Sequence, residues 1–589
     1  MYSLAFVEKL CRFKIHRRCL VAMSLALLLS RASPLAAVAC TAPGAYLGAP
    51  YPACTLFFTL CDGHERARVF HLSADNFIHA WQAGVARCTQ IAKRHKRPFQ
   101  WLRVDWVTAV ESTTWEAFNK RLHGTKRTYF RQGLAFDPAL KTAFLEQELN
   151  ANAILYGDTH LEHAEFNPSH FVDYANKRYG KPLKTDFSPQ MPVYLFSTEG
   201  LFCDAKSEPL PLLGTGWATG RRVTGPLTAG NVLRLLESGA TYLTRQVQKN
   251  GRFVYGCFPC FDREIPSYNA LRHASSTYAM LEAWELLQIP PLRAAIERAL
   301  DYLLHSLVRH YTLPDASTLA YVVDVDDEIK LGANAVALLA LVKYTELTGD
   351  QGHQPVMEQL ALGIAHLQDL STGQFCHVLN AENLTVKERF RTIYYDGEAT
   401  FGLMRLYGLT QDPRWLSVVV RAFDHFLVAE HWKAHDHWLG YSVNELTRHQ
   451  PEEKYFRFGL KNIADHLDFI LQRETAYPTL LELAMATEQL VSRLTEMPEM
   501  SHLLQELDVD KFYRSLHYRA DYLQNGFFWP EFAMYFKNPS KIVGSFFIRH
   551  HAFRVRIDDV EHYISGYVAY WKFLNRDGAS SCFQTDKMR

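Results

Sequence analysis

The second half of the chain repeats one order of helix, polar loop and helix, and this repeat restricts the possible folds most. An apolar helical pattern begins near Asn231, a polar turn follows, and a second apolar helix begins near Tyr268. The same order recurs to about residue 575 and gives six helix pairs. Repeats of this kind indicate stacked helix pairs that cannot bury their apolar faces alone. We therefore expect residues 228–575 to form one continuous helical array.

The repeat also predicts where each helix begins. The expected outer helices start near Asn231, Leu292, Pro355, Pro413, Lys454 and Leu503, and the expected inner helices near Tyr268, Asp327, Asp396, His435, Thr479 and Asp559. A glycine turn followed by an aromatic residue recurs at 250–253, 372–375 and 525–528. Six pairs can close into a ring, whereas an open solenoid needs polar caps at both ends. Ring closure is the preferred prediction, and an open solenoid is the alternative.

In repeat count and loop placement, residues 228–575 resemble the (α/α)6 toroids. These include the six-hairpin glycoside hydrolases, the polysaccharide lyases and the N-acylglucosamine 2-epimerases. The resemblance is one of architecture, and no catalytic motif of a single family matches residue by residue. It implies a mainly α protein, a toroid of six helical hairpins preceded by a smaller α+β domain, that acts on a carbohydrate.

The segment before the repeat, residues 41–206, has the mixed patterning of an α+β domain. Strands are predicted at 68–72 and 101–107, and a helix from Asn167 to Gly180, with a capping Asn, a following Pro and a terminal Gly. Residues 192–203 are predicted as a hairpin that turns near Glu199-Gly200. Pro and Gly concentrate in 207–227, which is predicted as a linker, and 576–589 is predicted as a tail.

The first 39 residues have the order of a secretory signal. Basic residues from Lys9 to Arg18 precede the apolar run Leu20–Leu29, and Ala37-Val-Ala39 forms a cleavage-site pattern. This pattern predicts export to the periplasm or the outside of the cell, and a short N-terminal anchor is the alternative. Cys40 directly follows the cleavage site, so a lipid tether at Cys40 is a further alternative for a chain that is otherwise soluble.

Charge and cysteine content exclude some classes of partner. With 63 Lys+Arg against 62 Asp+Glu, the formal charge of +1 gives no electrostatic reason to expect nucleic acid. The 11 cysteines are sparse, and two alternatives stay open: a disulfide between Cys257 and Cys260 or between Cys54 and Cys61, or buried free thiols. No metal ion and no other cofactor is expected, and the oligomeric state stays open.

Ionisable residues stand at every expected inner-helix start. In a closed ring the inner helices run in the same direction, so their N-terminal ends surround one opening. The predicted catalytic residues are Asp326, Glu328, Asp396, Glu398, Asp436, His437 and Asp558, and the predicted substrate-binding residues are Tyr268, Arg272, His273, Tyr395, Trp438, Glu482, Asp559 and His562. One such cluster is ordinarily a helix cap. Six clusters at corresponding positions favour a common pocket instead.

Three functions fit these residues. Glycoside hydrolysis needs two carboxyl groups, and the first pair expected is Asp326 or Glu328 with Asp396 or Glu398, while Asp558 is in reserve. Aromatic side chains would stack on the sugar, and Arg272 would bind a carboxylate, which suggests an acidic envelope or extracellular polysaccharide. The second hypothesis is a sugar epimerase or uronide lyase that uses the histidines. The third is a non-catalytic scaffold that binds a glycan or a protein.

Overall fold

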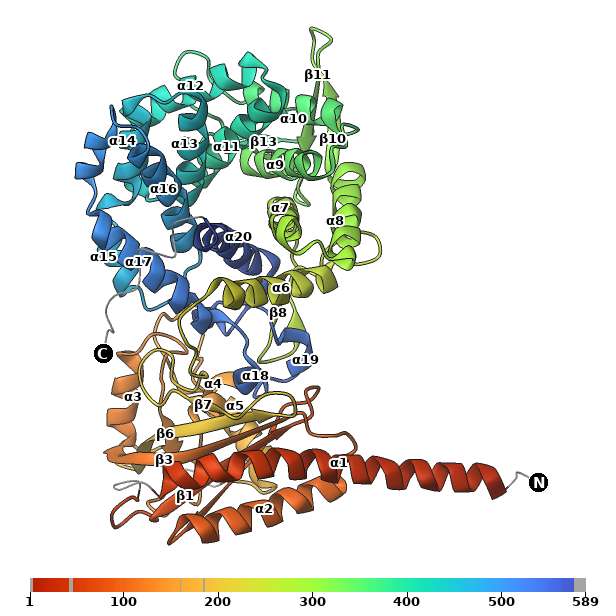
Figure 1. Ribbon diagram of the computed structural model, residues 1–589, viewed down its shortest axis with the longest axis vertical. Helices are drawn as coiled ribbons and strands as arrows, with labels where there is room; N and C mark the ends of the chain where they lie inside the picture. The colour runs from red at the N-terminus through yellow and green to blue at the C-terminus, as the bar shows by residue number, and fades with distance from the viewer. Residues whose placement is uncertain (1–3, 42–45, 159, 184–185, 577–589) are drawn as a thin grey trace. The chain divides into compact units, whose positions relative to one another are not determined.

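The computed structural model describes residues 4–41, 46–158, 160–183 and 186–576 of the 589-residue chain (Figure 1). The chain forms two compact units. Unit 1 consists of Met1–Gly225, Cys257–Arg263 and Asn525–Val555, and unit 2 consists of Pro226–Gly256, Glu264–Gln524 and Arg556–Arg589. The predicted tail lies outside the described residues from 577 onward.

Unit 1 is built on an antiparallel sheet of seven strands in the order β2-β1-β3-β6-β4-β5, with β7 paired to β6. The strands are β1 (Cys54–Cys61), β2 (Arg68–Ala74), β3 (Trp101–Thr114), β4 (Gly133–Ala135), β5 (Ala143–Phe144), β6 (Pro192–Asp204) and β7 (Leu210–Leu212). The helices are α1 (Leu4–Cys40), α2 (Phe77–Arg94), α3 (Trp115–His123), α4 (Glu146–Ala151), α5 (Pro168–Tyr179), α18 (Pro530–Ala533) and α19 (Pro539–Ile542).

The predicted strands at 68–72 and 101–107 are confirmed as β2 and β3, and the predicted helix is confirmed as α5. The Asn167 side chain accepts a hydrogen bond from the His170 amide, and Gly180 ends α5 with a positive φ of 69°. The predicted hairpin is wrong, because β6 runs without a turn through Gly200. A Cβ at Gly200 would lie 2.7 Å from Asp105 Oδ1, so this glycine permits a close approach to β3.

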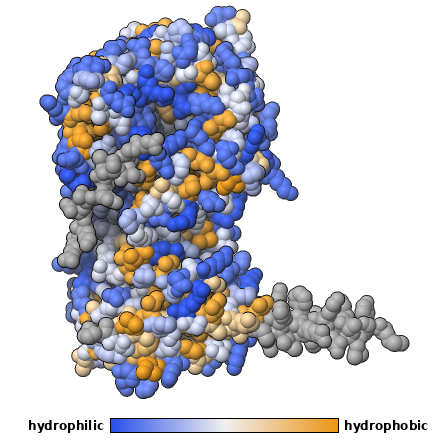
Figure 2. Space-filling model, in the orientation of Figure 1, coloured by the Kyte–Doolittle hydropathy of each residue, from blue (hydrophilic) through white to orange (hydrophobic). Residues whose placement is uncertain are grey.

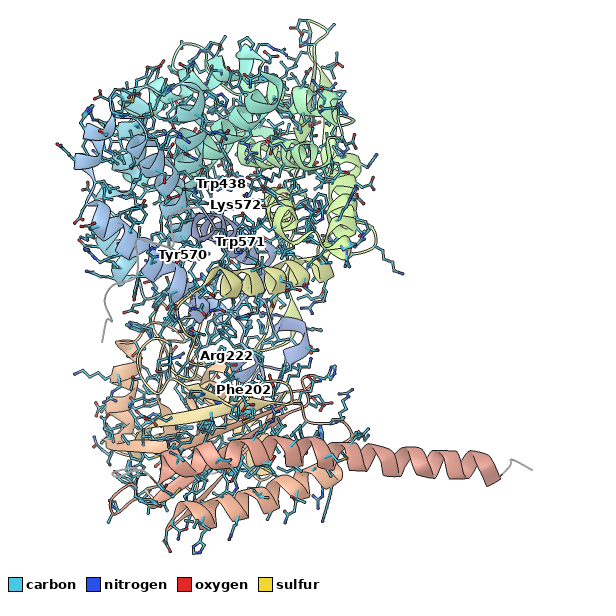
Figure 3. The ribbon with its side chains drawn as sticks, in the orientation of Figure 1. Phe202, Arg222, Trp438, Tyr570, Trp571 and Lys572 are labelled. Atoms are coloured by element: carbon cyan, nitrogen blue, oxygen red, sulfur yellow. The ribbon has the colours of Figure 1, made fainter. Side chains whose placement is uncertain are left out.

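Buried charges link distant segments of unit 1. Arg103 and Asp105 form an ion pair of 2.7 Å with both side chains 1% exposed. The segment predicted as a linker contributes β7 and Arg222, whose guanidinium bonds Glu531 and lies 5.5 Å from the Phe202 ring (Figure 3). Of the two alternatives for Cys54 and Cys61, the structure has buried free thiols and no disulfide, because these residues stand at opposite ends of β1. Cys260 is also a free, buried thiol.

Unit 2 is a closed ring of six helix pairs (Figure 1). The inner helices are α7 (Ala270–Leu287), α9 (Leu331–Thr348), α11 (Tyr394–Thr410), α13 (His437–His449), α16 (Thr479–Thr495) and α20 (Ile557–Leu574). Each packs on the next in this order, and α20 packs on α7. This closure confirms the predicted (α/α)6 toroid and is inconsistent with an open solenoid.

The outer helices surround this ring and pack on the inner ones. They are α6 (Ala229–Gln246), α8 (Pro290–Tyr302), α10 (Gln354–His366), α12 (Pro413–Val428), α14 (Glu453–Ala464) and α17 (Val509–Tyr522). Smaller elements complete unit 2: α15 (Leu467–Gln472), a π-helical turn at Leu303–Leu307, and strands β10 (Val308–Thr312), β11 (Thr318–Val322), β12 (Glu328–Lys330), β13 (Val378–Asn380) and β14 (Val386–Glu388).

The recurring glycine turn has a steric cause. Gly251 and Gly373 have φ values of +86° and +78°, which favour glycine. A Cβ at Gly251 would lie 2.0 Å from the carbonyl oxygen of Arg298 on α8, and a Cβ at Gly373 would lie 2.2 Å from that of Arg421 on α12. Both turns therefore press against the backbone of the next outer helix along the chain.

Candidate active site

The N-terminal ends of all six inner helices meet at one end of the ring. A Cβ at Gly332 on α9 would touch Glu398 of α11 and Leu271 of α7, and a Cβ at Gly397 on α11 would lie 2.5 Å from the Leu439 amide of α13. The remaining contacts run from α13 through α16 to α20 and from α20 back to α7. We name the polar side chains at this end the ring-end cluster: Glu398, Asp436, His437, Glu482, Asp558, Glu561 and His562.

Two histidines share one carboxylate at the centre of the ring-end cluster. His562 Nδ1 lies 2.8 Å from Glu482 Oε2, and His437 Nε2 lies 4.0 Å from the same oxygen. The two imidazole rings are 5.2 Å apart between centroids, and the Tyr441 hydroxyl donates to Glu482 Oε1 at 3.1 Å. His437 Nε2 is buried and makes no hydrogen bond with any described residue. One imidazole is therefore bonded to Glu482 and the other is available for proton transfer.

The charge state of His562 follows from its neighbours. Burial lowers the pKa of this imidazole, but the carboxyl groups of Glu561 and Glu482 outweigh burial and raise the pKa to about 10. His562 is therefore a cation at neutral pH. His437, Glu482 and His562 offer ligand atoms within 4.8 Å of one another, so this group could hold a metal ion if His562 gave up its proton. Without an ion, Glu482 and the protonated His562 form an ion pair.

Two carboxyl groups of the ring-end cluster have raised pKa values. Burial raises the pKa of Glu561 to about 8, with His562 opposing this shift and Glu482 adding to it. The Ser275 hydroxyl of α7 donates to Glu561 Oε2 at 2.9 Å. Burial also raises the pKa of Glu398 well above its usual range, and the charge of Asp436 adds to this effect. Glu398 and Glu561 can therefore donate protons at neutral pH.

Asp436 caps α13, as the simplest sequence interpretation allows. Its Oδ2 accepts from the Leu439 amide at 2.8 Å, and its Oδ1 lies 3.4 Å from His437 Nδ1. Asp436 Oδ1 makes no hydrogen bond with any described residue, so the carboxylate caps α13 and lies beside the His437 imidazole without being bonded to it.

Asp558 and Arg272, which the sequence suggests for catalysis and for substrate, bind each other. Arg272 Nε lies 2.8 Å from Asp558 Oδ2, and Arg556 Nη2 lies 2.9 Å from the same oxygen. Asp559 accepts a hydrogen bond from the backbone amide of Arg556 at 3.0 Å and forms the capping box of α20. These contacts connect α20 to α7 and stabilise the ring.

The first carboxylate pair expected from the sequence lies in different surroundings. Glu328 is on β12, where Arg391, Lys387 and Lys330 all approach within 3.2 Å. Hydrogen bonds from Arg391 hold the pKa of Glu328 far below its usual range, so Glu328 is not a proton donor. The Asp326 side chain is 51% exposed and lies 3.3 Å from Lys330.

Asp396 lies in the first turn of α11, beside His377, which directly precedes β13. One carboxylate oxygen lies 3.4 Å from His377 Nε2, and both side chains are buried. Glu398, two residues later, belongs to the ring-end cluster. Of the four residues proposed for the carboxylate pair, the structure therefore places only Glu398 in the cluster with His437 and His562.

The predicted aromatic residues are mostly buried. Tyr268 bonds His273 Nδ1 at 2.7 Å, and His273 Nε2 bonds the Ala299 carbonyl at 2.8 Å, which ties α7 to α8. Trp438 (Figure 3) is 3% exposed and lies 5.2 Å from the His437 ring. Tyr395 is buried as well. None of these rings presents an open face for sugar stacking.

The sequence interpretation missed four residues at this end of the ring. Tyr441 lies four residues after His437, so helical spacing could have identified it. Tyr394 is 41% exposed and its ring lies 5.9 Å from that of His437. Glu561 directly precedes His562, whereas Ser275 gives no signal in the sequence that separates it from ordinary helix residues.

No protein-family model matches the chain, and no curated protein matches it. Solved structures similar to it include a cellobiose 2-epimerase from Bacillus thermoamylovorans, with 12% identity, a TM-score of 0.43, and coverage of 58% of this chain and 98% of that one. A D-mannose isomerase has 10% identity, a TM-score of 0.45 and coverage of 59% and 99%. An α-1,6-mannanase from a Salegentibacter species has 10% identity, a TM-score of 0.40 and coverage of 57% and 98%. The helix contacts of unit 2 themselves establish its toroid fold.

Proposed function

We propose that the ring-end cluster is the active site of a carbohydrate-active enzyme that interconverts an aldose and a ketose. The observation that carries this proposal is the placement of His437 and His562 on one carboxylate, with Nε2 of His437 unbonded and His562 protonated. The sugar substrate rests on the resemblance of the helical repeat to the (α/α)6 enzymes.

The proposed reaction is a proton transfer between two neighbouring carbons. His437 Nε2 removes the proton from C2 of the open-chain aldose while His562 donates a proton to the carbonyl oxygen on C1, which gives a cis-enediol. His437 then returns its proton to C1, and the hydroxyl proton on O2 passes back to His562, which gives the ketose. No atom is gained or lost, and Glu482 stabilises the cationic form of His562 before the first proton transfer and after the last.

The short distance between the two rings supports isomerisation over two-sided epimerisation. A substrate carbon between two imidazoles needs a contact of about 3.5–4.0 Å on each side, so about 7–8 Å in total. The centroids of the His437 and His562 rings are only 5.2 Å apart. A substrate carbon does not fit between rings this close, which supports the proposal that both histidines act from one side of the substrate.

Glycoside hydrolysis is the second candidate, and Glu398 supports it. Its raised pKa suits a general acid, and Asp436 is the nearby carboxylate that would act as the base. The sequence hypothesis that used Asp326 or Glu328 has less support, because Glu328 is held in ion pairs. An acidic polysaccharide substrate also has less support, because Arg272 is bonded to Asp558.

The proposal is tested with the purified full-length chain and a panel of free aldoses, ketoses and disaccharides in D2O. We expect aldose–ketose interconversion, observed by NMR, with deuterium appearing at C1 or C2. His437→Asn, His562→Asn and Glu482→Gln should each lower kcat by about a hundredfold or more. His502→Asn is the matched control, because His502 is 55% exposed and lies outside the ring-end cluster.

Three results would contradict this function. Release of new reducing ends from a disaccharide would identify hydrolysis, and inversion at C2 without a ketose would identify epimerisation. Binding of a glycan without turnover, equal in the wild type and the three variants, would favour the non-catalytic scaffold.

A further inference from the structure

One face of the N-terminal helix α1 is packed into the core of unit 1. The seven side chains on this face are at most 7% exposed: Val21, Leu25, Leu28, Leu29, Ala32, Ala36 and Cys40. They pack with α2, β3 and β6 in one apolar cluster. Two hydrogen bonds fix the helix in place, since Ser24 Oγ accepts from the Phe99 amide at 3.2 Å and Arg31 donates to the Ser207 carbonyl at 2.6 Å. This part of α1 is therefore integrated into the domain.

The opposite face of α1 is exposed and also apolar. Leu20, Met23, Leu27, Leu35 and Val38 are 41–72% exposed. Between Arg18 and Cys40 the sequence has one charged residue, Arg31, and its guanidinium is bonded to unit 1. A helix that is apolar on all sides is normally buried or in contact with lipid. Figure 2 shows apolar side chains gathered over α1 and α2.

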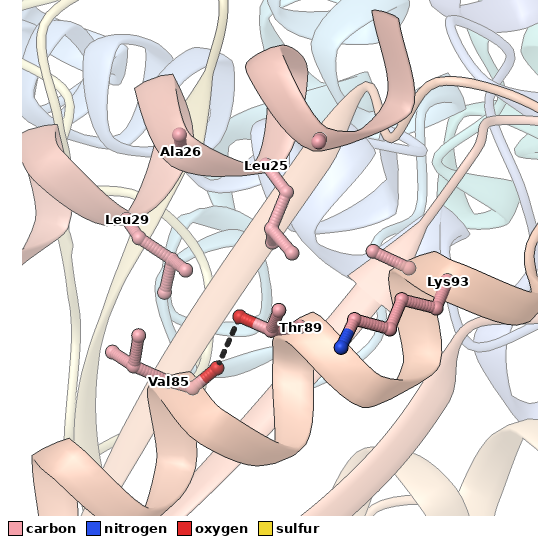
Figure 4. A pocket seen from close by; sticks show the side chains of 8 residues that line it. Leu25, Ala26, Leu29, Val85, Thr89 and Lys93 are labelled. Atoms are coloured by element: carbon pink, nitrogen blue, oxygen red, sulfur yellow. Dashed lines mark hydrogen bonds between the residues drawn. The ribbon is translucent and has the colours of Figure 1, made fainter. Parts of the chain in front are cut away.

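Basic side chains adjoin this apolar face. Lys93, Arg94 and Lys96 are exposed at and just after the C-terminal end of α2, and the exposed Arg97 forms ion pairs with Asp62 and Glu65. An open cavity of about 680 Å³ lies between α1 and α2, lined by Leu25 and Leu29 on one side and by Val85 and Lys93 on the other (Figure 4). Apolar walls with an ammonium group at the edge match the acyl chain and phosphate of an anionic phospholipid.

We propose that α1 stays in the mature protein and that its outer face, together with Lys93–Arg97, attaches unit 1 to an anionic membrane surface. The helix lies along the membrane with Met23 and Val38 in the lipid, and its inner face stays on unit 1. Because α1 packs against the domain over its length from Val21 to Cys40, it does not cross the bilayer. The residues Leu20–Cys40 have a mean hydropathy of 1.7, which gives them affinity for lipid in this orientation.

Retention of α1 conflicts with the cleavage after Ala39 that the sequence pattern predicts. Cleavage would remove six of the seven packed side chains and expose the apolar cluster that contains Cys88, Leu102 and Cys203. Exposed apolar surface of that extent favours aggregation or a new contact. Retention keeps this core covered and explains why polar contacts to Phe99 and Ser207 are built into the segment.

Sedimentation of the full-length chain with lipid vesicles tests the membrane surface. We expect binding to vesicles of phosphatidylglycerol and phosphatidylcholine in equal amounts, and little binding to phosphatidylcholine alone. The double variant Met23→Glu/Val38→Glu should bind about tenfold more weakly at unchanged thermal stability. Removing Lys93, Arg94 and Lys96 as Gln variants should weaken binding about fivefold per charge at low salt.

The matched control is Leu370→Glu/Val428→Glu, which adds the same charge at apolar side chains of unit 2 that are 75% and 86% exposed. It should bind vesicles as the wild type does. Mass spectrometry of the chain recovered from cell membranes should show residues before Cys40. A mass that lacks the first 39 residues, wild-type binding by the Met23→Glu/Val38→Glu variant, or resistance to carbonate extraction would overturn the proposal.

Discussion

Replacing Glu561 by glutamine tests whether the ring-end cluster holds neutral acids. The Glu561 side chain is 2% exposed, and burial raises its pKa from 4.5 to about 8. Glutamine has the shape of the neutral acid and can still accept from Ser275, so the folded structure should be kept. The difference between the two proteins is then a difference in proton binding.

The sign of the effect follows from the raised pKa. Between pH 4.5 and about 8 the folded state keeps the proton of Glu561, whereas the unfolded state has lost it. The stabilising contribution of the wild-type side chain is therefore complete below pH 4.5 and is lost as pH rises to about 8. The slope is about 1.4 kcal/mol per pH unit, so about 3 kcal/mol between about pH 5.5 and about pH 7.5. The Glu561→Gln variant has no such loss at this position.

Urea unfolding at three pH values in this range measures the difference. The free energy of unfolding of Glu561→Gln minus that of the wild type should rise by about 1.4 kcal/mol per pH unit and level off above pH 8. Glu297→Gln is the control, because Glu297 is 44% exposed. The free energy of unfolding of this variant minus that of the wild type should not change with pH in this range. A flat difference for Glu561→Gln as well would show that this acid is ionised in the folded state and would refute the reasoning.

Two further predictions concern stability and the choice of catalytic residues. Gly251→Ala should lower the free energy of unfolding by more than about 3 kcal/mol in denaturant titrations. The control Gly349→Ala, with φ +75° and open space around its Cβ position, should lower it by only about 1 kcal/mol. Equal losses would contradict the steric explanation of the turn. Glu328→Gln should lower the free energy of unfolding by about 2 kcal/mol, because the Glu328 carboxylate forms ion pairs, and should leave turnover within about twofold of the wild type. A loss of turnover comparable to that of Glu482→Gln would restore Glu328 as a catalytic residue.

The helices of unit 2 were largely predictable because their signals are local. Caps, prolines and apolar spacing place most helix starts within a few residues, and Pro413 and Thr479 are the observed first residues of α12 and α16. The start expected near Leu503 is six residues early, because α17 begins at Val509. The expected start near Asp327 is four residues early, because β12 intervenes before α9 begins at Leu331. The β6 strand was misread because Gly200 serves a contact with β3, and sequence alone does not separate such a glycine from a turn.

The candidate site was predictable in its location and less so in its roles. Helix polarity in a closed ring brings the N-terminal ends together, so His437, Glu482 and His562 could be expected as neighbours. The ion pairs of the Glu328 carboxylate could not be anticipated, because Lys387 and Arg391 reach it from a strand and a loop about sixty residues away. Partners at that separation are set by tertiary packing, which leaves no spacing rule in the sequence.

Ring closure itself explains why ordinary capping residues can become a reactive group. A single helix N-terminus favours a carboxylate, because the helix dipole and the free amides stabilise negative charge. Six such ends in one place bring several carboxyl groups together in a buried volume, where desolvation and mutual repulsion oppose ionisation. Glu398 and Glu561 consequently keep their protons, while Glu482 lies against a protonated imidazole and Asp436 is held by an amide. The proton donors and acceptors thus arise from the position of each side chain in the closed ring, and the same residues on an open solenoid would be solvated caps.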